Sequence, residues 1–166
     1  MTNYFIGYGS LLSHNSLKKT IKDRDFIPVI VKGFKRIFNV DLDPNSNKDL
    51  DVLNIVKDKN SFFNGILIKI TDEELLKLKE REKHYVFEKV EAKDINSNKI
   101  YKNCILSIDH NLDIDLGFKK PDQSYFDLCR EAAYHINENF GNMFDETTFT
   151  SDGTRVKEFL LKNPDY

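Results

Sequence analysis

The amino-acid sequence predicts an α+β protein with a mixed, largely antiparallel β-sheet and helices packed outside it. Apolar residues alternate at the two-residue period of a half-buried strand over residues 26–40, 62–70, 85–92 and 99–108. Capping residues followed by apolar residues at helical spacing instead indicate helices that start near residues 72 and 122. A chain of 166 residues can bury the core of one such domain, so residues 1–166 are expected to form a single domain.

A short apolar strand at residues 4–6 is expected to lead into a glycine loop, which we define as residues 7–10. Gly7 and Gly9 allow a sharp turn in which successive backbone N–H groups point at one spot, a geometry that suits a carboxylate or a phosphate. Ser13 is expected to cap a short helix that runs to residue 22 and whose dipole adds to this preference for an anion. The alternative is a tight turn with no ligand.

Further strands and helices follow from periodicity and turn residues. Gly33 predicts a bulge in the strand at residues 26–40, and residues 41–51 and 109–120 have loop composition. A short strand is expected at residues 52–56, and residues 96–98 form the turn of a hairpin between the last two strands. The helix from residue 122 is expected to run to residue 139 and to end at Gly141, and a last helix spans residues 154–161.

The helix that begins at Asp72 carries the carboxylate of greatest interest. Thr71 and Glu74 form a capping box, which fixes where this helix starts. Leu75, Leu78 and Glu82 then follow at i, i+3 and i+7, so Glu82 takes the next place on the core-facing stripe, and Glu80 and Arg81 are expected to point elsewhere. A desolvated carboxylate has a raised pKa that suits proton exchange near neutrality. The alternative is that the helix ends by Arg81 and Glu82 is an exposed turn residue or forms an ion pair with a nearby lysine.

Composition excludes several classes of function. The 25 basic and 27 acidic residues are interspersed, which argues against a nucleic-acid surface. Cys104 and Cys129 lie in apolar patterns, and four scattered histidines show no ligand spacing, so no metal or other cofactor is expected. No apolar run approaches a membrane span, and we expect a soluble cytoplasmic protein. The glycine loop also lacks the GK[ST] of a phosphate loop and the third glycine of a dinucleotide fingerprint.

Several segments in order resemble the gamma-glutamylcyclotransferase-like family over nearly the whole chain. The matching segments are Tyr8-Gly9-Ser10-Leu11, Lys35-Arg36-Ile37-Phe38-Asn39, Leu53-Asn54-Ile55-Val56 followed by Gly65, residues 78–85, and Gln123-Ser124-Tyr125. This resemblance implies that the sheet curls into a small barrel, with the site at its mouth. It also implies a cofactor-free enzyme that acts on a small γ-glutamyl molecule and exists as a monomer or homodimer.

The same resemblance assigns roles to individual residues. Glu82 matches the catalytic glutamate, which moves protons during the reaction. The other site residues that the resemblance implies, with the substrate as their partner, are Tyr8, Gly9, Ser10, Leu11, Tyr85 and Tyr125. Each tyrosine has an alternative role as a packed core aromatic whose hydroxyl is satisfied. Arg36 is expected in a structural ion pair, and the alternative is that it meets a carboxylate of the ligand.

Two other classes of function stay open. The family commonly has an acidic residue where this chain has Lys79 and a glycine where it has Lys83, so a non-catalytic module that binds a small acidic metabolite is the first alternative. An acyl hydrolase that uses Ser10 as nucleophile is the second, although the sequence offers no local base for it.

Overall fold

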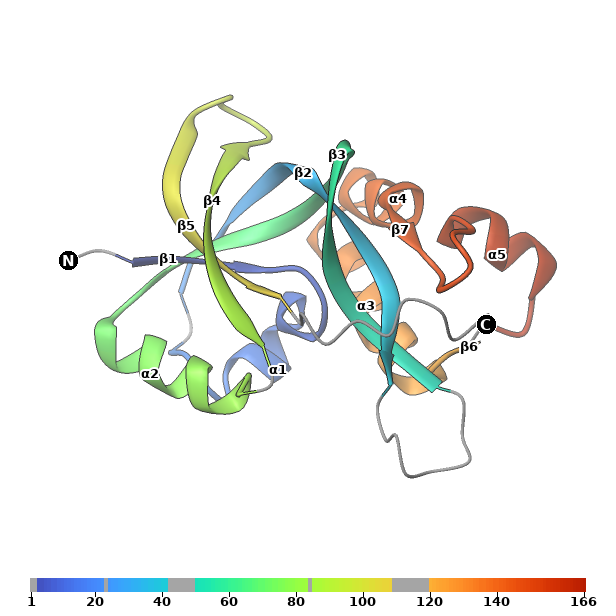
Figure 1. Ribbon diagram of the computed structural model, residues 1–166, viewed down its shortest axis with the longest axis horizontal. Helices are drawn as coiled ribbons and strands as arrows, with labels where there is room; N and C mark the ends of the chain where they lie inside the picture. The colour runs from blue at the N-terminus through green and yellow to red at the C-terminus, as the bar shows by residue number, and fades with distance from the viewer. Residues whose placement is uncertain (1–2, 23, 42–49, 84, 109–119) are drawn as a thin grey trace.

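The computed structural model describes residues 3–22, 24–41, 50–83, 85–108 and 120–166 (Figure 1). The predicted loops at residues 41–51 and 109–120 lie almost entirely outside these residues. His84 and His110 also lie outside them.

Five strands form a closed mixed barrel, which confirms the predicted fold class. They are β1 (Asn3–Gly7), β2 (Ile27–Asp41), β3 (Leu50–Ile70), β4 (Val86–Asp94) and β5 (Ile100–Ile108). Around the barrel the order is β3, β1, β5, β4 and β2, and β2 pairs again with β3. Only β1 and β5 run parallel among these neighbours; the other pairs are antiparallel. Two short parallel strands, β6 (Lys120–Pro121) and β7 (Thr148–Phe149), extend β3 and β2.

Strand β3 corrects the expectation of two separate strands at residues 52–56 and 62–70. Lys32 of β2 pairs with Phe62 and Phe34 pairs with Lys57, so residues 58–61 bulge out opposite Gly33 and the ladder then resumes. The Asp58 carboxylate holds this bulge, because it accepts hydrogen bonds from the Asn60 N–H at 3.0 Å and the Ser61 hydroxyl at 2.8 Å. Polar residues in the middle of β3 therefore mark a local turn within one strand.

Five α-helices are assigned in the described residues, and a 3₁₀ turn, η1 (Ser10–Leu12), precedes the first of them. They are α1 (His14–Leu17), α2 (Asp72–Arg81), α3 (Gln123–Ile136), α4 (Glu138–Thr147) and α5 (Val156–Lys162). The capping box at Thr71 and Glu74 and the start of α2 at Asp72 are confirmed. None of these helices has the length and apolar character needed to cross a membrane.

The helix expected at residues 122–139 is in fact two helices. Asn137 ends α3 and caps α4, because its side chain accepts a hydrogen bond from the Phe140 N–H. Gly141 lies inside α4 and does not end a helix. A Cβ atom at Gly141 would lie 2.3 Å from Cγ of Tyr134, so glycine here allows α4 to pack closely against α3.

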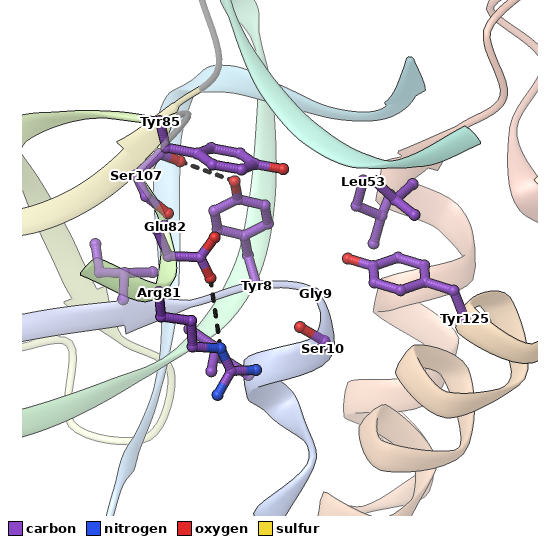
Figure 2. A pocket seen from close by; sticks show the side chains of 12 residues that line it. Tyr8, Gly9, Ser10, Leu53, Arg81, Glu82, Tyr85, Ser107 and Tyr125 are labelled. Atoms are coloured by element: carbon purple, nitrogen blue, oxygen red, sulfur yellow. Dashed lines mark hydrogen bonds and ion pairs between the residues drawn. The ribbon is translucent and has the colours of Figure 1, made fainter. Parts of the chain in front are cut away.

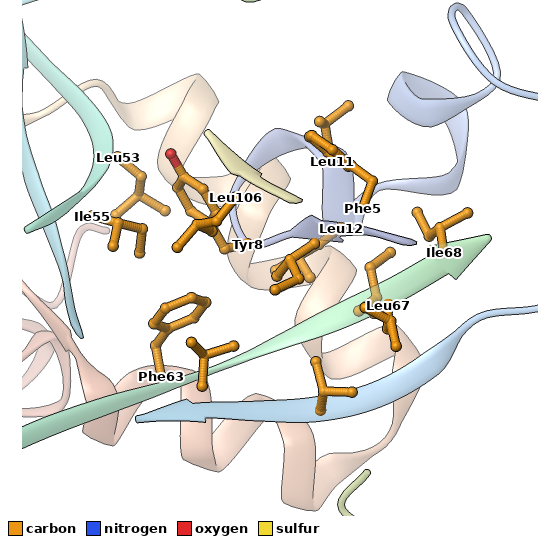
Figure 3. Close-up of a cluster of buried hydrophobic side chains, with 14 of the residues drawn as sticks. Phe5, Tyr8, Leu11, Leu12, Leu53, Ile55, Phe63, Leu67, Ile68 and Leu106 are labelled. Carbon is orange, nitrogen blue, oxygen red and sulfur yellow. The ribbon is translucent and has the colours of Figure 1, made fainter. Parts of the chain in front are cut away.

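The core fills the barrel and continues under the C-terminal helices. Inside the barrel, Phe5, Phe63, Leu67 and Leu106 are almost completely buried (Figure 3). The β2–β3 ribbon carries Phe38 toward α3, where its ring packs on Phe126 with the centroids 5.7 Å apart. Helices α3 and α4 lie side by side against this ribbon, with α5 beyond them (Figure 1). The mouth of the barrel therefore faces α3.

Candidate active site

A cavity of about 220 Å³ opens where the glycine loop, the end of α2 and the start of α3 meet (Figure 2). Its lining includes all of the residues predicted for the site: Tyr8, Gly9, Ser10, Leu11, Glu82, Tyr85 and Tyr125. Ile6, Val52 and Leu53 form an apolar part of its wall. Residues that are more than a hundred positions apart in the chain therefore share one small space.

The glycine loop and Leu11, which directly follows it, contribute backbone donors to this cavity. The N–H groups of Leu12 and Ser13 donate to the carbonyls of Gly9 and Ser10, both at 3.0 Å, and so close the η1 turn. By contrast, the N–H groups of Gly9, Ser10 and Leu11 have no acceptor among the residues that the structure describes. Three successive donors next to the cavity are suited to bind an oxygen that carries negative charge.

The helix expected to reinforce these donors is shorter than predicted. Ser13 does cap α1, but α1 is a single turn that ends at Leu17 and does not reach residue 22. The η1 turn also separates the glycine loop from α1. Any preference of the loop for an anion therefore depends on the backbone N–H groups themselves and not on a helix dipole.

Tyr125 enters the cavity from the first turn of α3, directly against Gly9. The Asp122 carboxylate caps α3 by accepting a hydrogen bond from the Tyr125 N–H at 2.8 Å. A Cβ atom at Gly9 would lie 2.7 Å from the Tyr125 hydroxyl oxygen, so the lack of a side chain at Gly9 makes room for this hydroxyl. Burial, with a further contribution from Cys129, raises the pKa of Tyr125 well above its usual value. Its hydroxyl therefore stays neutral and able to donate.

The other two tyrosines differ from each other. The Tyr8 hydroxyl donates to the Ser107 carbonyl at 2.8 Å, and its ring packs edge-on against Phe63, as a core aromatic would. Tyr85 instead directs its hydroxyl toward the open space between α2 and α3, as do Ser10 and Tyr125 from the opposite side (Figure 2). Tyr8 therefore supports the wall of the cavity, whereas the Tyr85 hydroxyl faces the space that a ligand would fill.

Glu82 is the acidic residue of the cavity lining. It caps the C-terminal end of α2, directly after Arg81, so the helix ends where the alternative expectation placed its end. The side chain is nevertheless not an exposed turn residue, since only 19% of it is accessible and it faces the cavity (Figure 2). Burial raises the pKa of Glu82 above its ordinary value, and the charge of Arg81 partly opposes this rise.

Arg81 also lines the cavity, contrary to the expectation that it points elsewhere. Its Nε lies 3.9 Å from Oε1 of Glu82. Its Nη1 and Nη2 donate to Ser16 and Thr20 at distances of 2.7 to 3.0 Å, which fixes the guanidinium between α2 and the segment around α1. The spacing i, i+3 from the buried Leu78 is the sequence signal that places Arg81 near the core-facing stripe.

Arg36 does not line the cavity but contacts Tyr8, which does, and its contacts differ from the expected ion pair. The side chain is completely buried, and its five hydrogen bonds go to neutral oxygens of Tyr8, Asn64, Thr147 and Thr148. One of them, from Nη1, reaches the carbonyl of Tyr8 at 3.3 Å. Burial lowers the pKa of Arg36 to about 9, so the side chain is still charged at neutral pH. Arg36 thus anchors the backbone of Tyr8, which lies within the glycine loop.

The closed barrel and the cavity at its mouth define a protein of gamma-glutamylcyclotransferase-like fold. A structure titled gamma-glutamyl cyclotransferase matches with a TM-score of 0.71 and 16% identity, over 87% of this chain and 86% of the other. An uncharacterized protein from Homo sapiens matches with a TM-score of 0.72 and 16% identity, over 99% of both chains.

A third similar structure is that of a yeast gamma-glutamyl cyclotransferase specific to glutathione. It matches with a TM-score of 0.51 and 16% identity, over 99% of this chain and 86% of the other. Neither a family model nor a curated protein matches the sequence. These likenesses therefore show the fold alone, and the residues of the cavity are the evidence for its chemistry.

Proposed function

We propose that the protein is a cofactor-free γ-glutamyl cyclotransferase that releases 5-oxoproline from a γ-glutamyl amino acid, a γ-glutamylamine or glutathione. One observation carries this proposal. A largely buried carboxylate, Glu82, and the N–H groups of Gly9, Ser10 and Leu11, for which the described part of the chain offers no acceptor, line the same small cavity. A proton-transfer group and an anion-binding loop in one cavity are what an intramolecular acyl transfer requires.

The proposed reaction is a ring closure. The α-amine of the glutamyl group attacks the carbon of its own side-chain carbonyl, and the new C–N bond closes the five-membered ring of 5-oxoproline. The bond from this carbon to the leaving nitrogen then breaks. Because both reacting groups belong to one molecule, a cavity that holds the chain curled supplies much of the acceleration.

Two proton transfers accompany this ring closure, and Glu82 is the residue we assign to both. The α-amine is normally an ammonium ion, which must lose a proton before it attacks, and the leaving nitrogen must gain one. A carboxylate with a raised pKa can accept the first proton and donate it in the second step. In this proposal the loop N–H groups stabilise the oxyanion that forms on the attacked carbonyl.

The tyrosines have supporting roles in this proposal. Tyr85 and Tyr125 donate hydrogen bonds to the substrate from two sides of the cavity, and the pKa of Tyr125 keeps its hydroxyl protonated. Tyr8 holds the wall through its bond to Ser107.

The two alternatives receive less support from the cavity. Lys79 and Lys83, the departures that favour a non-catalytic binding module, are not among the residues that line it. Ser10, the nucleophile of an acyl hydrolase, has no hydrogen bond to a basic side chain among the described residues. We therefore favour the cyclotransferase over both.

The test is to incubate the protein with a panel of γ-glutamyl amino acids, γ-glutamylamines and glutathione and to measure 5-oxoproline by mass spectrometry. Glu82→Gln should reduce the rate at least about a hundredfold, as expected when a general acid–base group is lost. Glu80→Gln, an exposed position two residues earlier, is the matched control and should retain the rate. Equal rates for wild type and Glu82→Gln would overturn the role of Glu82. No product from any compound would favour the binding module.

A further inference from the structure

The guanidinium of Arg81 is hydrogen-bonded to the segment around α1 on one side, and on the other side it lines the cavity and forms a 3.9 Å ion pair with Glu82. Its Nη1 donates to the Ser16 carbonyl at 2.9 Å and to the Thr20 hydroxyl at 3.0 Å, and its Nη2 donates to the Ser16 hydroxyl at 2.7 Å. Such a side chain has lost most of its rotamer freedom before any ligand arrives. A ligand can therefore bind to the Arg81 guanidinium at little further cost in conformational entropy.

Two N–H donors of the Arg81 guanidinium remain for a ligand. A guanidinium has five N–H donors, and three of them are used by Ser16 and Thr20. The Nε–H and one N–H of Nη2 have no hydrogen-bond acceptor in the described part of the chain, since Nε lies 3.9 Å from the Glu82 carboxylate. Donors on Nε and on a terminal nitrogen of one guanidinium form the fork that binds both oxygens of a carboxylate.

The chemistry of a γ-glutamyl group indicates which carboxylate this fork would meet. The α-amine and the α-carboxylate are attached to the same carbon, so they cannot bind far apart. If Glu82 takes a proton from the α-amine, the α-carboxylate must lie next to Glu82, where the Arg81 guanidinium is. The γ-carbonyl, at the other end of the curled chain, is then left to the N–H groups of the glycine loop.

We propose that Arg81 is a substrate-binding residue that holds the α-carboxylate of the glutamyl group beside Glu82. This inference rests on the proposed function for the identity of the ligand. It adds a requirement to that function, because the substrate must carry a free α-carboxylate. It also separates the tasks within the cavity: Arg81 orients the glutamyl group, Glu82 moves protons and the glycine loop receives the oxyanion.

Binding measurements with the product and its neutral analogue test this role without requiring turnover. Isothermal titration calorimetry is carried out with L-5-oxoproline and with its carboxamide, which lacks the negative charge. Wild type should bind L-5-oxoproline about ten- to a hundredfold more tightly, as expected for charge-assisted hydrogen bonds. Arg81→Gln should remove this preference by weakening the acid alone. The affinity for the carboxamide should stay within about twofold.

A purely structural role for Arg81 gives a different result. Ser16→Ala removes one of the contacts that join Arg81 to the segment around α1, and it leaves the guanidinium in place. This variant should keep the preference for the acid. A preference that survives in Arg81→Gln would overturn the proposal, as would a wild-type protein that binds both compounds equally or binds neither.

A parallel turnover experiment separates failure of this inference from failure of the proposed function. A γ-glutamyl compound is compared with its α-carboxamide, and 5-oxoproline or its amide is measured. Equal kcat/KM for both compounds would refute the role of Arg81 and leave the cyclotransferase intact. Absence of any product, together with a clear preference for the acid in calorimetry, would refute the cyclotransferase and leave Arg81 as a carboxylate-binding residue.

Discussion

The carboxylate of Glu82 is held where its charge destabilises the folded protein. Burial raises its pKa in the native state, so the native state binds more protons than the unfolded state over the pH range between the two pKa values. Stability is therefore lost as the pH rises through that range, and the loss persists at higher pH. A loss of stability from a buried ionisable group is common at catalytic sites, where the shifted pKa serves the reaction.

This cost predicts that Glu82→Gln stabilises the protein in a pH-dependent way. At pH 7 the variant should have the higher Tm, because it no longer buries a negative charge. Below about pH 4, near the ordinary pKa of a glutamate, the two proteins should unfold at the same temperature. Thermal unfolding at both pH values measures the difference, with Glu80→Gln as the control. A wild type that is more stable at pH 7 would contradict the prediction.

Gly9 and Tyr125 form a second pair whose geometry can be tested at the level of single residues. A Cβ atom at Gly9 would come within 2.7 Å of the Tyr125 hydroxyl, so Gly9→Ala should cost about 1 to 3 kcal/mol of stability through overpacking. Tyr125→Phe removes the clashing oxygen, so Gly9→Ala should cost much less in that background. Urea unfolding of the four proteins in this double-mutant cycle gives the coupling energy. Additive effects would show that the hydroxyl is not the source of the clash.

At the scale of elements, local capping signals predicted the structure better than single glycines did. The Thr71–Glu74 capping box fixed the start of α2, because both of its hydrogen bonds lie within four residues. Gly141 was wrongly expected to end the helix that begins at residue 122, because its role depends on a contact with Tyr134 of the neighbouring helix that no local pattern contains. Asn137 was the better signal, since it caps α4 through its own side chain.

The cavity, too, has features that local sequence predicts and features that depend on contacts between distant parts of the chain. Residues that line it come from β1, η1, β3, β5 and α3 and from the end of α2, and the spacing along the chain cannot bring such distant elements together. The family resemblance supplied that arrangement for Glu82, the glycine loop and the tyrosines, and their roles stay predictions. The resemblance assigned no role to Arg81. Its spacing from Leu78 was the local signal, and its contacts with Ser16 and Thr20 show how its guanidinium is held.

The packing of α3 against α4 predicts that Gly141→Ala destabilises the protein, although alanine favours a helix by about 1 kcal/mol over glycine. The new Cβ would lie 2.3 Å from the Tyr134 ring, and the Tyr134 hydroxyl is fixed by its 2.6 Å bond to Asp145. Overpacking of about 1 to 3 kcal/mol should therefore outweigh the gain in propensity. Urea unfolding measures the change. Asn139→Ala, at an exposed position of α4, should cause no comparable loss.

At the scale of the whole molecule, Arg36 connects the barrel with the C-terminal layer. It lies on β2, and its donors reach Tyr8 at the end of β1, Asn64 on β3 and Thr148 on β7. The guanidinium also lies over the ring of Phe144 of α4, with Cζ 4.2 Å from the ring centroid. One buried cation on β2 thus satisfies acceptors on β3, on β7, at the end of α4 and on Tyr8, the residue that follows β1.

Arg36→Met is therefore expected to destabilise the molecule by about 3 to 5 kcal/mol, because five buried hydrogen bonds are lost, and this is a large share of the total stability of a domain this size. Methionine fills part of the space but removes the guanidinium donors to the Tyr8 and Asn64 carbonyls. Chemical unfolding should give one cooperative transition in both proteins, as expected if residues 1–166 form a single domain. Arg155→Met, at an exposed position, is the control and should change stability by less than about 0.5 kcal/mol. Two separate transitions in Arg36→Met would show that the barrel and the C-terminal helices fold independently.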